Sequence, residues 1–214
     1  RFLITALGPL SAFTLPNIEG RETFKGPAYH TARWPHEEVD FSGKRVGIIG
    51  TGACAIQTIQ TIAKDVVHLT VFQRSPNWAA PLNNSVITED EQRQIKQDFE
   101  KIFEQCRKTI ASFIHDPDPR STTDLTPDER EAFWEKLYKE PGFGIWIGNL
   151  KDILVDEQAN KLMTEFAAKK IRERVKDPKI AKLLTPKNHG FGTRRLPLES
   201  GYYEVYNQEN VLLV

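Results

Sequence analysis

Residues 44–55 read K-R-V-G-I-I-G-T-G-A-C-A, a short apolar run that ends in a glycine-rich turn. A continuous apolar run preceded by charged residues is typical of a buried parallel strand. Residues 50–63 then read as the turn and a helix, and residues 68–73 (H-L-T-V-F-Q) are a second run rich in β-forming side chains. Strand, glycine turn, helix and strand within about thirty residues predict one βαβ unit.

The glycine turn has the residues that a dinucleotide needs. Gly50 permits the tight turn out of the strand, Gly52 lets the backbone approach a pyrophosphate, and Ala55 lets helix and strand pack closely. The pyrophosphate would accept hydrogen bonds from free backbone N–H groups at the positive end of the helix. We predict a cofactor site here, in which the Thr51 hydroxyl also contacts the phosphates; the alternative is a tight turn that binds nothing. The predicted residues are Gly50, Thr51, Gly52, Ala53 and Ala55.

The end of the second strand indicates which dinucleotide is bound. An NAD site usually places Asp or Glu about twenty residues past the glycines, where it accepts hydrogen bonds from the ribose. Here the sequence is Gln73-Arg74-Ser75, without a carboxylate. Arg74 can bind a 2′-phosphate through its guanidinium, and Ser75 adds a hydroxyl donor. We therefore predict NADP(H), with Gln73, Arg74 and Ser75 in its site; a solvated surface arginine is the alternative.

Residues 88–184 are charged and helical in pattern. Thr88 and Thr126 are each followed three residues later by glutamate, which predicts two helix-capping boxes, the second with proline at the first helical position. Residues 115–126 are rich in Asp, Pro and Thr, which predicts a loop. Two apolar stripes follow helical spacing. They are Ile95, Phe99, Ile102, Phe103, Cys106 and Ile110 in the first, and Met163, Ala167, Ile171 and Val175 in the second.

Both ends have strand-like composition, over residues 2–6 and residues 202–214. We therefore predict an α/β fold, in which a Rossmann-like parallel-sheet NADP domain carries a long helical insertion. The expected divisions are a strand end and linker at 1–43, the NADP-binding Rossmann unit at 44–87, the helical insertion at 88–187 and the return to the NADP domain at 188–214.

The composition argues against several classes of protein. Lys plus Arg and Asp plus Glu number 29 each, so a zero formal net charge argues against a general binder of nucleic acid or anionic membrane. No apolar stretch approaches the ~20 residues that span a bilayer. Cys54 and Cys106 are the two cysteines; they form no disulfide framework and no metal site, and they favour the cytoplasm. We assign Cys54 no redox role.

Residues 24–35 read F-K-G-P-A-Y-H-T-A-R-W-P. Their composition indicates a structured linker, in which a lone histidine is more often a structural hydrogen-bonding residue than a catalyst. The F-x-G-x-x-x-H-x-x-x-W-P spacing, however, resembles the fingerprint of Baeyer–Villiger monooxygenases at every defining position. The matching residues are Phe24, Gly26, His30, Trp34 and Pro35.

The resemblance extends over nearly the whole chain and is least specific in the helical insertion. Residues 3–11 (L-I-T-A-L-G-P-L-S) resemble the strand that leaves the family's flavin domain, although Leu7 departs from the usual A-T-G or A-S-G. Residues 70–78 (T-V-F-Q-R-S-P-N-W) resemble the second strand of its NADPH domain. Residues 192–195 (G-T-R-R), followed by Y-Y-E at 202–204, resemble the return to that domain.

The resemblance implies a flavoenzyme that uses FAD, NADPH and O2 to convert ketones to esters or lactones through a flavin peroxide. It implies that Arg195 is the catalytic arginine beside the flavin, and that Arg194 helps to hold the 2′-phosphate. Without the resemblance, Arg195 is an ordinary ion-pairing arginine. His30 is expected to be structural and to couple domain motion to catalysis, not to act as an acid or base.

The family's G-x-G-x-x-G flavin fingerprint and active-site aspartate are absent from this sequence. We therefore expect the chain to be the central NADPH-domain portion of a longer flavoprotein with two dinucleotide domains, with the FAD site mostly outside it. The expected partners are a small ketone and O2, and neither nucleic acid nor membrane. The alternatives are a related N- or S-oxygenating monooxygenase and a non-catalytic NADPH-binding module.

Overall fold

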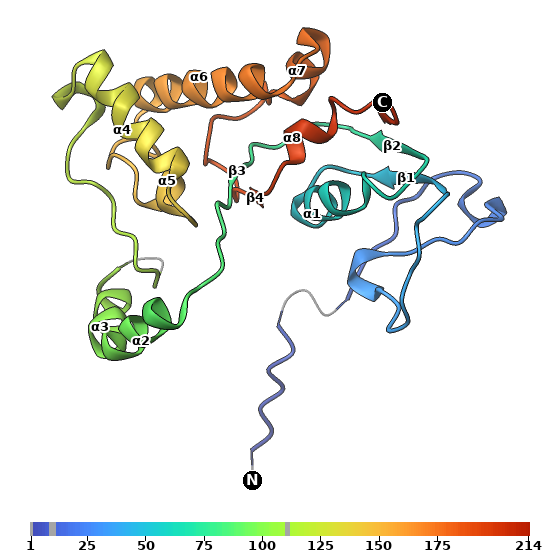
Figure 1. Ribbon diagram of the computed structural model, residues 1–214, viewed down its shortest axis with the longest axis horizontal. Helices are drawn as coiled ribbons and strands as arrows, with labels where there is room; N and C mark the ends of the chain where they lie inside the picture. The colour runs from blue at the N-terminus through green and yellow to red at the C-terminus, as the bar shows by residue number, and fades with distance from the viewer. Residues whose placement is uncertain (1, 9–11, 110–111) are drawn as a thin grey trace. The chain divides into compact units, whose positions relative to one another are not determined.

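A computed structural model describes residues 2–8, 12–109 and 112–214 of the chain (Figure 1). The chain forms two compact units, Arg1–Asp40 and Phe41–Val214. The first has little regular structure, and the second contains the strands and long helices of the described residues.

A three-stranded parallel sheet organises the second unit. Strand β1 (Arg45–Ile49) pairs with β2 (His68–Phe72), which also pairs with β5 (Val211–Leu213), so that the strand order is β1-β2-β5 (Figure 1). Helix α1 (Ala53–Ile62) connects β1 to β2, which confirms the βαβ unit. The register aligns the last residues of β1 and β2, so their carboxyl ends meet at the glycine turn.

The core of the sheet lies against α1, where Ile56, Ile59, Leu69 and Val71 are fully buried. The prediction that β1 is buried was wrong: none of its five residues is fully buried, and Ile49 is 66% exposed. The reason is that β1 lies at the edge of the sheet, where β2 is its one strand neighbour among the described elements.

The helical insertion lies between two short strands, β3 (Ala80–Pro81) and β4 (Leu198–Glu199), which pair in parallel. No helix of the described residues is both long and apolar enough to cross a membrane. The elements of the insertion are α2 (Glu89–Gln97), α3 (Phe99–Lys108), the 3-10 turn η3 (Thr122–Asp124), α4 (Pro127–Lys139), α5 (Gly144–Ile147), α6 (Glu157–Arg174) and α7 (Pro178–Leu184).

Both predicted capping boxes are confirmed. The Glu91 backbone N–H donates to Thr88 Oγ1 at 3.2 Å, and the Thr88 N–H donates to the Glu91 carboxylate at 2.7 Å. Thr126 and Glu129 make the same pair of bonds at 3.3 and 2.8 Å. The stripe predicted for α6 is also buried. Its members are Met163, Ala167, Ile171 and Val175.

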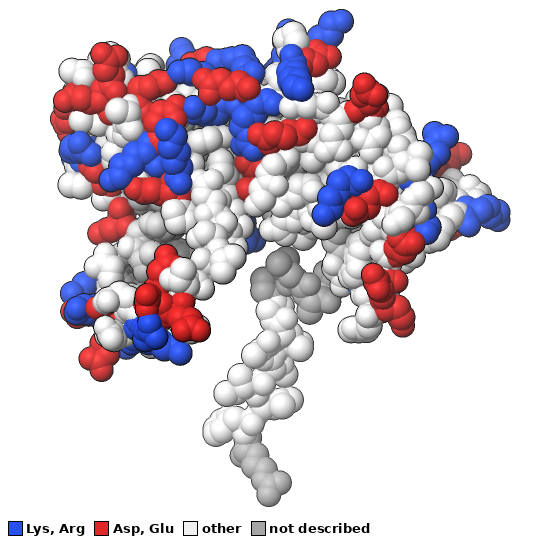
Figure 2. Space-filling view, viewed as in Figure 1, with Lys and Arg blue, Asp and Glu red and all other residues white. Residues whose placement is uncertain are grey.

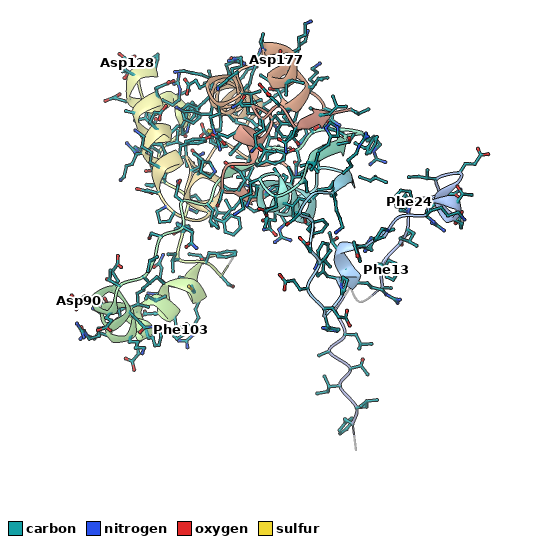
Figure 3. The ribbon with its side chains drawn as sticks, turned by 45° about the vertical axis from the view of Figure 1, so that its right-hand side comes forward. Phe13, Phe24, Asp90, Phe103, Asp128 and Asp177 are labelled. Carbon is teal, nitrogen blue, oxygen red and sulfur yellow. The ribbon has the colours of Figure 1, made fainter. Side chains whose placement is uncertain are left out.

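The first apolar stripe differs from the prediction. Asp98 leaves helical geometry at φ −94°, ψ 4° and divides the expected helix into α2 and α3. Neither helix buries a side chain completely among the described residues, and Phe99 and Phe103 are 44% and 55% exposed. Phe103 is labelled in Figure 3. Ile110, the last member of the stripe, lies outside the described residues.

The expectation of strand structure over residues 202–214 is correct only for β5. Residues Tyr202–Val205 form the short helix α8 instead. The cause is Glu199, whose Oε2 accepts the backbone N–H groups of Gly201 at 2.9 Å and Tyr202 at 2.8 Å. These are the N–H groups that a helix start leaves without a partner, so the carboxylate favours a helical turn here.

A buried ion-pair network connects the insertion to β4 and α8. Arg174 of α6 donates to both oxygens of Glu199 at 2.7 and 3.0 Å, and its Nε donates to Glu204 at 2.6 Å. The Glu199 side chain is 0% exposed. Burial alone would lower the pKa of Arg174, but the carboxylates of Glu204 and Glu199 outweigh it and raise this pKa above its usual range. The network therefore holds a fully charged arginine.

The first unit contains two 3-10 turns, η1 (Arg21–Thr23) and η2 (Thr31–Arg33). The strand predicted over residues 2–6 is not formed, and Phe2, Leu3 and Ile4 are at least 88% exposed. A strand needs a neighbouring strand for its backbone hydrogen bonds, and the described residues of this unit provide none.

Candidate functional site

The glycine turn leaves β1 at its carboxyl end and leads into α1. Gly50 adopts φ +101°, which favours glycine, and its N–H donates to the Phe72 carbonyl at 2.8 Å. Gly52 is the N-cap of α1, so no side chain caps the first N–H groups, and the first turn contains no acidic residue. A Cβ on Gly52 would meet no atom within 4 Å. The positive end of α1 is thus open to an anion.

The two alanines of the predicted site and Thr51 lie in this turn and at the start of α1. Ala53 is the first residue of the helix, and Ala55 packs against the core, as predicted for close packing of helix and strand. Thr51 is buried, and its hydroxyl donates to the Ser75 carbonyl at 3.0 Å. Because that proton is bound within the protein, the backbone N–H of Thr51 is the donor that it can offer to a phosphate.

The end of β2 presents Arg74 to solvent. Gln73 is held by two bonds, from its N–H to the Val214 carbonyl at 2.7 Å and from its side-chain amide to the Leu183 carbonyl at 3.0 Å. Arg74 is exposed and has no ion pair or hydrogen bond within the described residues. Its guanidinium is therefore available to a ligand, at the strand end where the sequence predicts the 2′-phosphate.

Two more available arginines lie in residues 188–196, here called the arginine loop. Arg194 and Arg195 are exposed, and in the described part of the chain neither side chain makes an ion pair. The loop around them is anchored, since Phe191 and Leu196 are 2% and 1% exposed. Within the described residues, Arg195 therefore lacks the ion-pair partner that residue type alone suggests.

Asn77 connects the end of β2 to the arginine loop. Its Nδ2 donates to the Arg195 carbonyl at 3.5 Å, a long hydrogen bond, and its Oδ1 lies 3.2 Å from His189 Nε2. His189 Nδ1 lies 2.7 Å from a second amide oxygen, Asn188 Oδ1, so both ring nitrogens face side-chain amides. Burial, and then the charge of Arg194, lowers the pKa of His189 below its ordinary value.

These contacts join three parts of the predicted site. Ser75 is bonded to the glycine turn, and Asn77, two residues later, is bonded to the arginine loop. An uncapped helix start and three guanidinium groups without an ion pair among the described residues suit a ligand that carries several phosphates. Sequence reasoning missed Asn77 and His189 as site residues, because no local pattern shows that they meet.

The fingerprint residues lie in the first unit. His30 Nδ1 accepts the Ala32 N–H at 3.1 Å and so caps η2, and the His30 ring packs on Phe13 with centroids 4.8 Å apart. Phe24, labelled in Figure 3, lies over Gly26, where a Cβ would come within 2.7 Å of the ring. Gly26 is thus required for this local packing, and one nitrogen of His30 is occupied by the backbone.

Charged side chains and a hollow also lie outside the predicted site in the described part of the chain. Over α4 and α6, Figure 2 shows Lys and Arg interspersed with Asp and Glu, as the zero net charge suggests. A hollow of about 410 Å³ lies at the junction of α6 and α7, lined in part by Arg172 and Lys182. It is formed by other residues than those of the predicted site.

Comparison with known proteins relates the chain to a family. Over its full length the chain is 47% identical to 2-oxo-Delta(3)-4,5,5-trimethylcyclopentenylacetyl-CoA monooxygenase of Pseudomonas putida and 38% identical to a Baeyer–Villiger monooxygenase of Pseudooceanicola batsensis. Its fold matches the crystal structure of OTEMO in complex with FAD and NADP with a TM-score of 0.95 at 46% identity, covering 98% of this chain and 40% of that one. The chain is homologous to a segment of Baeyer–Villiger monooxygenases. The resemblance of its fingerprint to this family is thereby confirmed.

The match to Baeyer–Villiger monooxygenases covers only part of their length. The chain spans about 40% of the length of the curated relatives that it matches, 40% of the first and 39% of the second. The α/β fold is confirmed by the structural match, and that neighbour is a complex with FAD and NADP. Phenazine N-monooxygenase PhzNO1 of Lysobacter antibioticus is also 36% identical over the whole chain, which covers 39% of it. No protein-family model matches the chain.

Proposed function

We propose that this chain is the NADPH-binding portion of a Baeyer–Villiger monooxygenase that oxidises ketones to esters or lactones with FAD, NADPH and O2. The observation that carries the proposal is the open glycine turn, linked through Ser75 and Asn77 to the arginine loop, with Arg74, Arg194 and Arg195 making no ion pair among the described residues. An open helix start and free guanidinium groups fit a dinucleotide with an extra phosphate, and no carboxylate occupies the position that an NAD site would use.

Different residues of the site would bind different groups of the cofactor. Backbone N–H groups at the start of α1 would bind the pyrophosphate, and the space in front of Gly52 would admit it. Arg74 would bind the 2′-phosphate with Gln73 and Ser75 beside it, and Arg194 would add a second positive charge. When bound, NADPH supplies the hydride and FAD the oxygen chemistry, so this chain supplies binding, orientation and charge.

Arg195 would serve the oxygenation step. A guanidinium stays cationic at any working pH, so Arg195 can stabilise negative charge on the oxygen that attacks the substrate carbonyl. The absence of an ion pair on Arg195 in the described chain supports this role, because a paired arginine would be partly neutralised. His30 would keep a structural role, since its Nδ1 is bonded to the backbone.

We assign one role to each of the four segments that the sequence predicts. Residues 1–43 would contain the end of a flavin-domain strand and the fingerprint linker, and residues 44–87 would bind NADP(H). Residues 88–187 would be the helical insertion, and residues 188–214 would return to the NADP domain. The FAD site would lie mostly in other parts of the full-length protein.

Product analysis tests the proposed function. The full-length parent protein, incubated with FAD, NADPH, air and a panel of cyclic and linear ketones, is expected to give an ester or lactone one oxygen atom heavier than its ketone. Mass spectrometry identifies this product. Consumption of NADPH that releases only hydrogen peroxide with every ketone would count against the proposal.

One relative favours a second candidate function. The 36% identical phenazine N-monooxygenase is named for oxygen transfer to nitrogen. The same assay with aromatic N-heterocycles and amines would then yield N-oxides, and ketones would remain unchanged. A parent protein that binds NADPH but neither binds flavin nor forms any oxygenated product would instead support a non-catalytic NADPH-binding module.

Replacing Arg74 by alanine tests the assignment of the 2′-phosphate. A charge-assisted hydrogen bond to phosphate is worth about 1.5–3 kcal/mol, so the KM for NADPH should rise on the order of tenfold or more. The KM for NADH, which lacks the phosphate, should stay within about twofold. Steady-state kinetics with both cofactors measures the difference.

The matched control for Arg74 is Arg45→Ala. Arg45 is also exposed, but it begins β1 and so lies at the opposite end of the sheet from the glycine turn. This variant should change neither KM. If Arg74→Ala raised the KM of both cofactors equally, Arg74 would not be the residue that binds the 2′-phosphate.

A further inference from the structure

Helix α6 holds the middle of the arginine loop by its backbone. Asn160 Nδ2 donates to the Phe191 carbonyl at 2.9 Å, and the Phe191 N–H donates to Thr164 Oγ1 at 2.9 Å. The same Asn160 amide also donates to the Ile153 carbonyl at 2.9 Å. Both backbone groups of Phe191 are therefore satisfied by side chains of the helical insertion, three residues before Arg194.

Trp146 of α5 holds the next residue of the loop. Its indole Nε1 donates to the Gly192 carbonyl at 2.9 Å. Gly192 adopts φ +73°, and a Cβ there would come within 2.8 Å of the indole Cδ1. The indole thus packs directly on bare backbone and hydrogen-bonds it, two residues before Arg194. This contact joins residues 46 positions apart in the sequence.

Beyond Gly192 the loop has fewer anchors. Thr193 Oγ1 donates to the Gly190 carbonyl at 2.9 Å, a bond within the loop itself. The Arg195 carbonyl accepts only the long 3.5 Å bond from Asn77 among the bonds described for it, before Leu196 is buried again. The bond from Trp146 is therefore the last short one from outside the loop before the two arginines.

We propose that Trp146 is a positioning residue for Arg194 and Arg195, through its indole hydrogen bond to the Gly192 carbonyl and its packing on the Gly192 backbone. The helical insertion thereby fixes the path of the arginine loop. The consequence for oxygenation rests on the proposed function, whereas the consequence for loop order does not. Trp146 contacts the loop backbone and acts on the reaction only through the arginines.

Trp146→Phe in the full-length parent removes the indole donor but keeps an aromatic ring. Because trypsin cleaves after arginine only where the chain can open, the rate of cleavage after Arg194 and Arg195 reports the order of the loop. Losing one hydrogen bond to backbone should raise this rate about fivefold to tenfold. Peptide masses identify the cleavage sites.

Trp134→Phe is the matched control. The Trp134 indole N–H also donates within the insertion, to Asn149 Oδ1 at 3.0 Å, and its side chain is buried. It does not contact the arginine loop in the described contacts, so cleavage after Arg194 and Arg195 should stay within about twofold of wild type. Equal acceleration by both variants, or none by Trp146→Phe, would overturn the positioning role.

A second variant tests the same contact by changing the loop residue instead of the tryptophan. Gly192→Ala presses a methyl group against the Trp146 indole and strains a backbone with positive φ. It should accelerate the same two cleavages even though the indole is still present. Unchanged cleavage in Gly192→Ala would contradict the packing part of the proposal.

Measuring ester formation distinguishes a failure of the Trp146 proposal from a failure of the proposed function. With a ketone that wild type oxidises, Trp146→Phe should form several-fold less ester per NADPH consumed, and its KM for NADPH should rise several-fold because Arg194 helps to bind the 2′-phosphate. A wild type that forms no ester would refute the proposed function, and the trypsin comparison would still decide the positioning role. A wild type that forms ester alongside a fully coupled Trp146→Phe variant would refute the inference alone.

Discussion

Arg195→Ala in the full-length parent protein is expected to lower the rate of ester formation on the order of a hundredfold to a thousandfold, while reduction of the flavin by NADPH stays within about threefold of wild type. Removing one preorganised group that stabilises developing negative charge typically costs this much in rate. Flavin reduction does not depend on that charge, so the two half-reactions should separate. Stopped-flow absorbance follows flavin reduction, and mass spectrometry measures the ester.

Two further variants define the chemical requirement at Arg195. Arg195→Lys keeps a positive charge but loses the planar pair of donors, so its rate should lie between those of wild type and alanine. Arg107→Ala removes an exposed arginine of α3, outside the arginine loop, and should leave both half-reactions unchanged. If Arg195→Ala formed ester at the wild-type rate, this arginine would have no part in oxygenation.

Arg174→Met is expected to produce a large loss of stability. It leaves the Glu199 carboxylate buried without its cation, and breaking a buried ion pair on one side costs about 3–5 kcal/mol. For a unit of this size such a loss lowers the midpoint of thermal unfolding by about 6 °C or more. Thermal unfolding of the full-length protein, compared among variants, measures the shift.

The control for Arg174 lies two residues away on the same helix. Arg172 pairs with Glu165 at the surface, where side chains are 52% and 73% exposed, and such pairs contribute about 0–1 kcal/mol. Arg172→Met should therefore shift the midpoint little. The double variant Arg174→Met, Glu199→Gln should be more stable than Arg174→Met alone, since it removes the unpaired charge. Equal shifts for Arg172→Met and Arg174→Met would show that the network does not hold the insertion.

The parts of the fold that the sequence predicted correctly depend on neighbours in the chain. The βαβ unit follows from periodicity and from Gly50, and both capping boxes place their two partners three residues apart. The wrong predictions of secondary structure concern segments whose interaction partners are distant in the sequence or not present in the described residues. Residues 202–205 are helical because Glu199 is held in place by Arg174, and residues 2–6 have strand composition but no strand beside them.

The candidate site shows the same division. The glycine turn and Arg74 belong to one local motif, and their use in binding the cofactor stays a prediction. The contacts that hold the arginine loop could not be predicted in this way. Asn77 and His189 are 112 positions apart in the sequence, and Trp146 and Gly192 are 46 apart. Only the tertiary structure therefore reveals these two contacts.

The central claim is that the glycine turn and the free arginines of this chain bind NADP(H). A structure of the full-length parent protein with bound NADP⁺ tests it most directly. We expect the pyrophosphate to contact the backbone N–H groups at the start of α1, and the 2′-phosphate to lie about 3 Å from the guanidinium of Arg74. A cofactor bound away from Gly52, or a 2′-phosphate that contacts neither Arg74 nor Arg194, would contradict the claim.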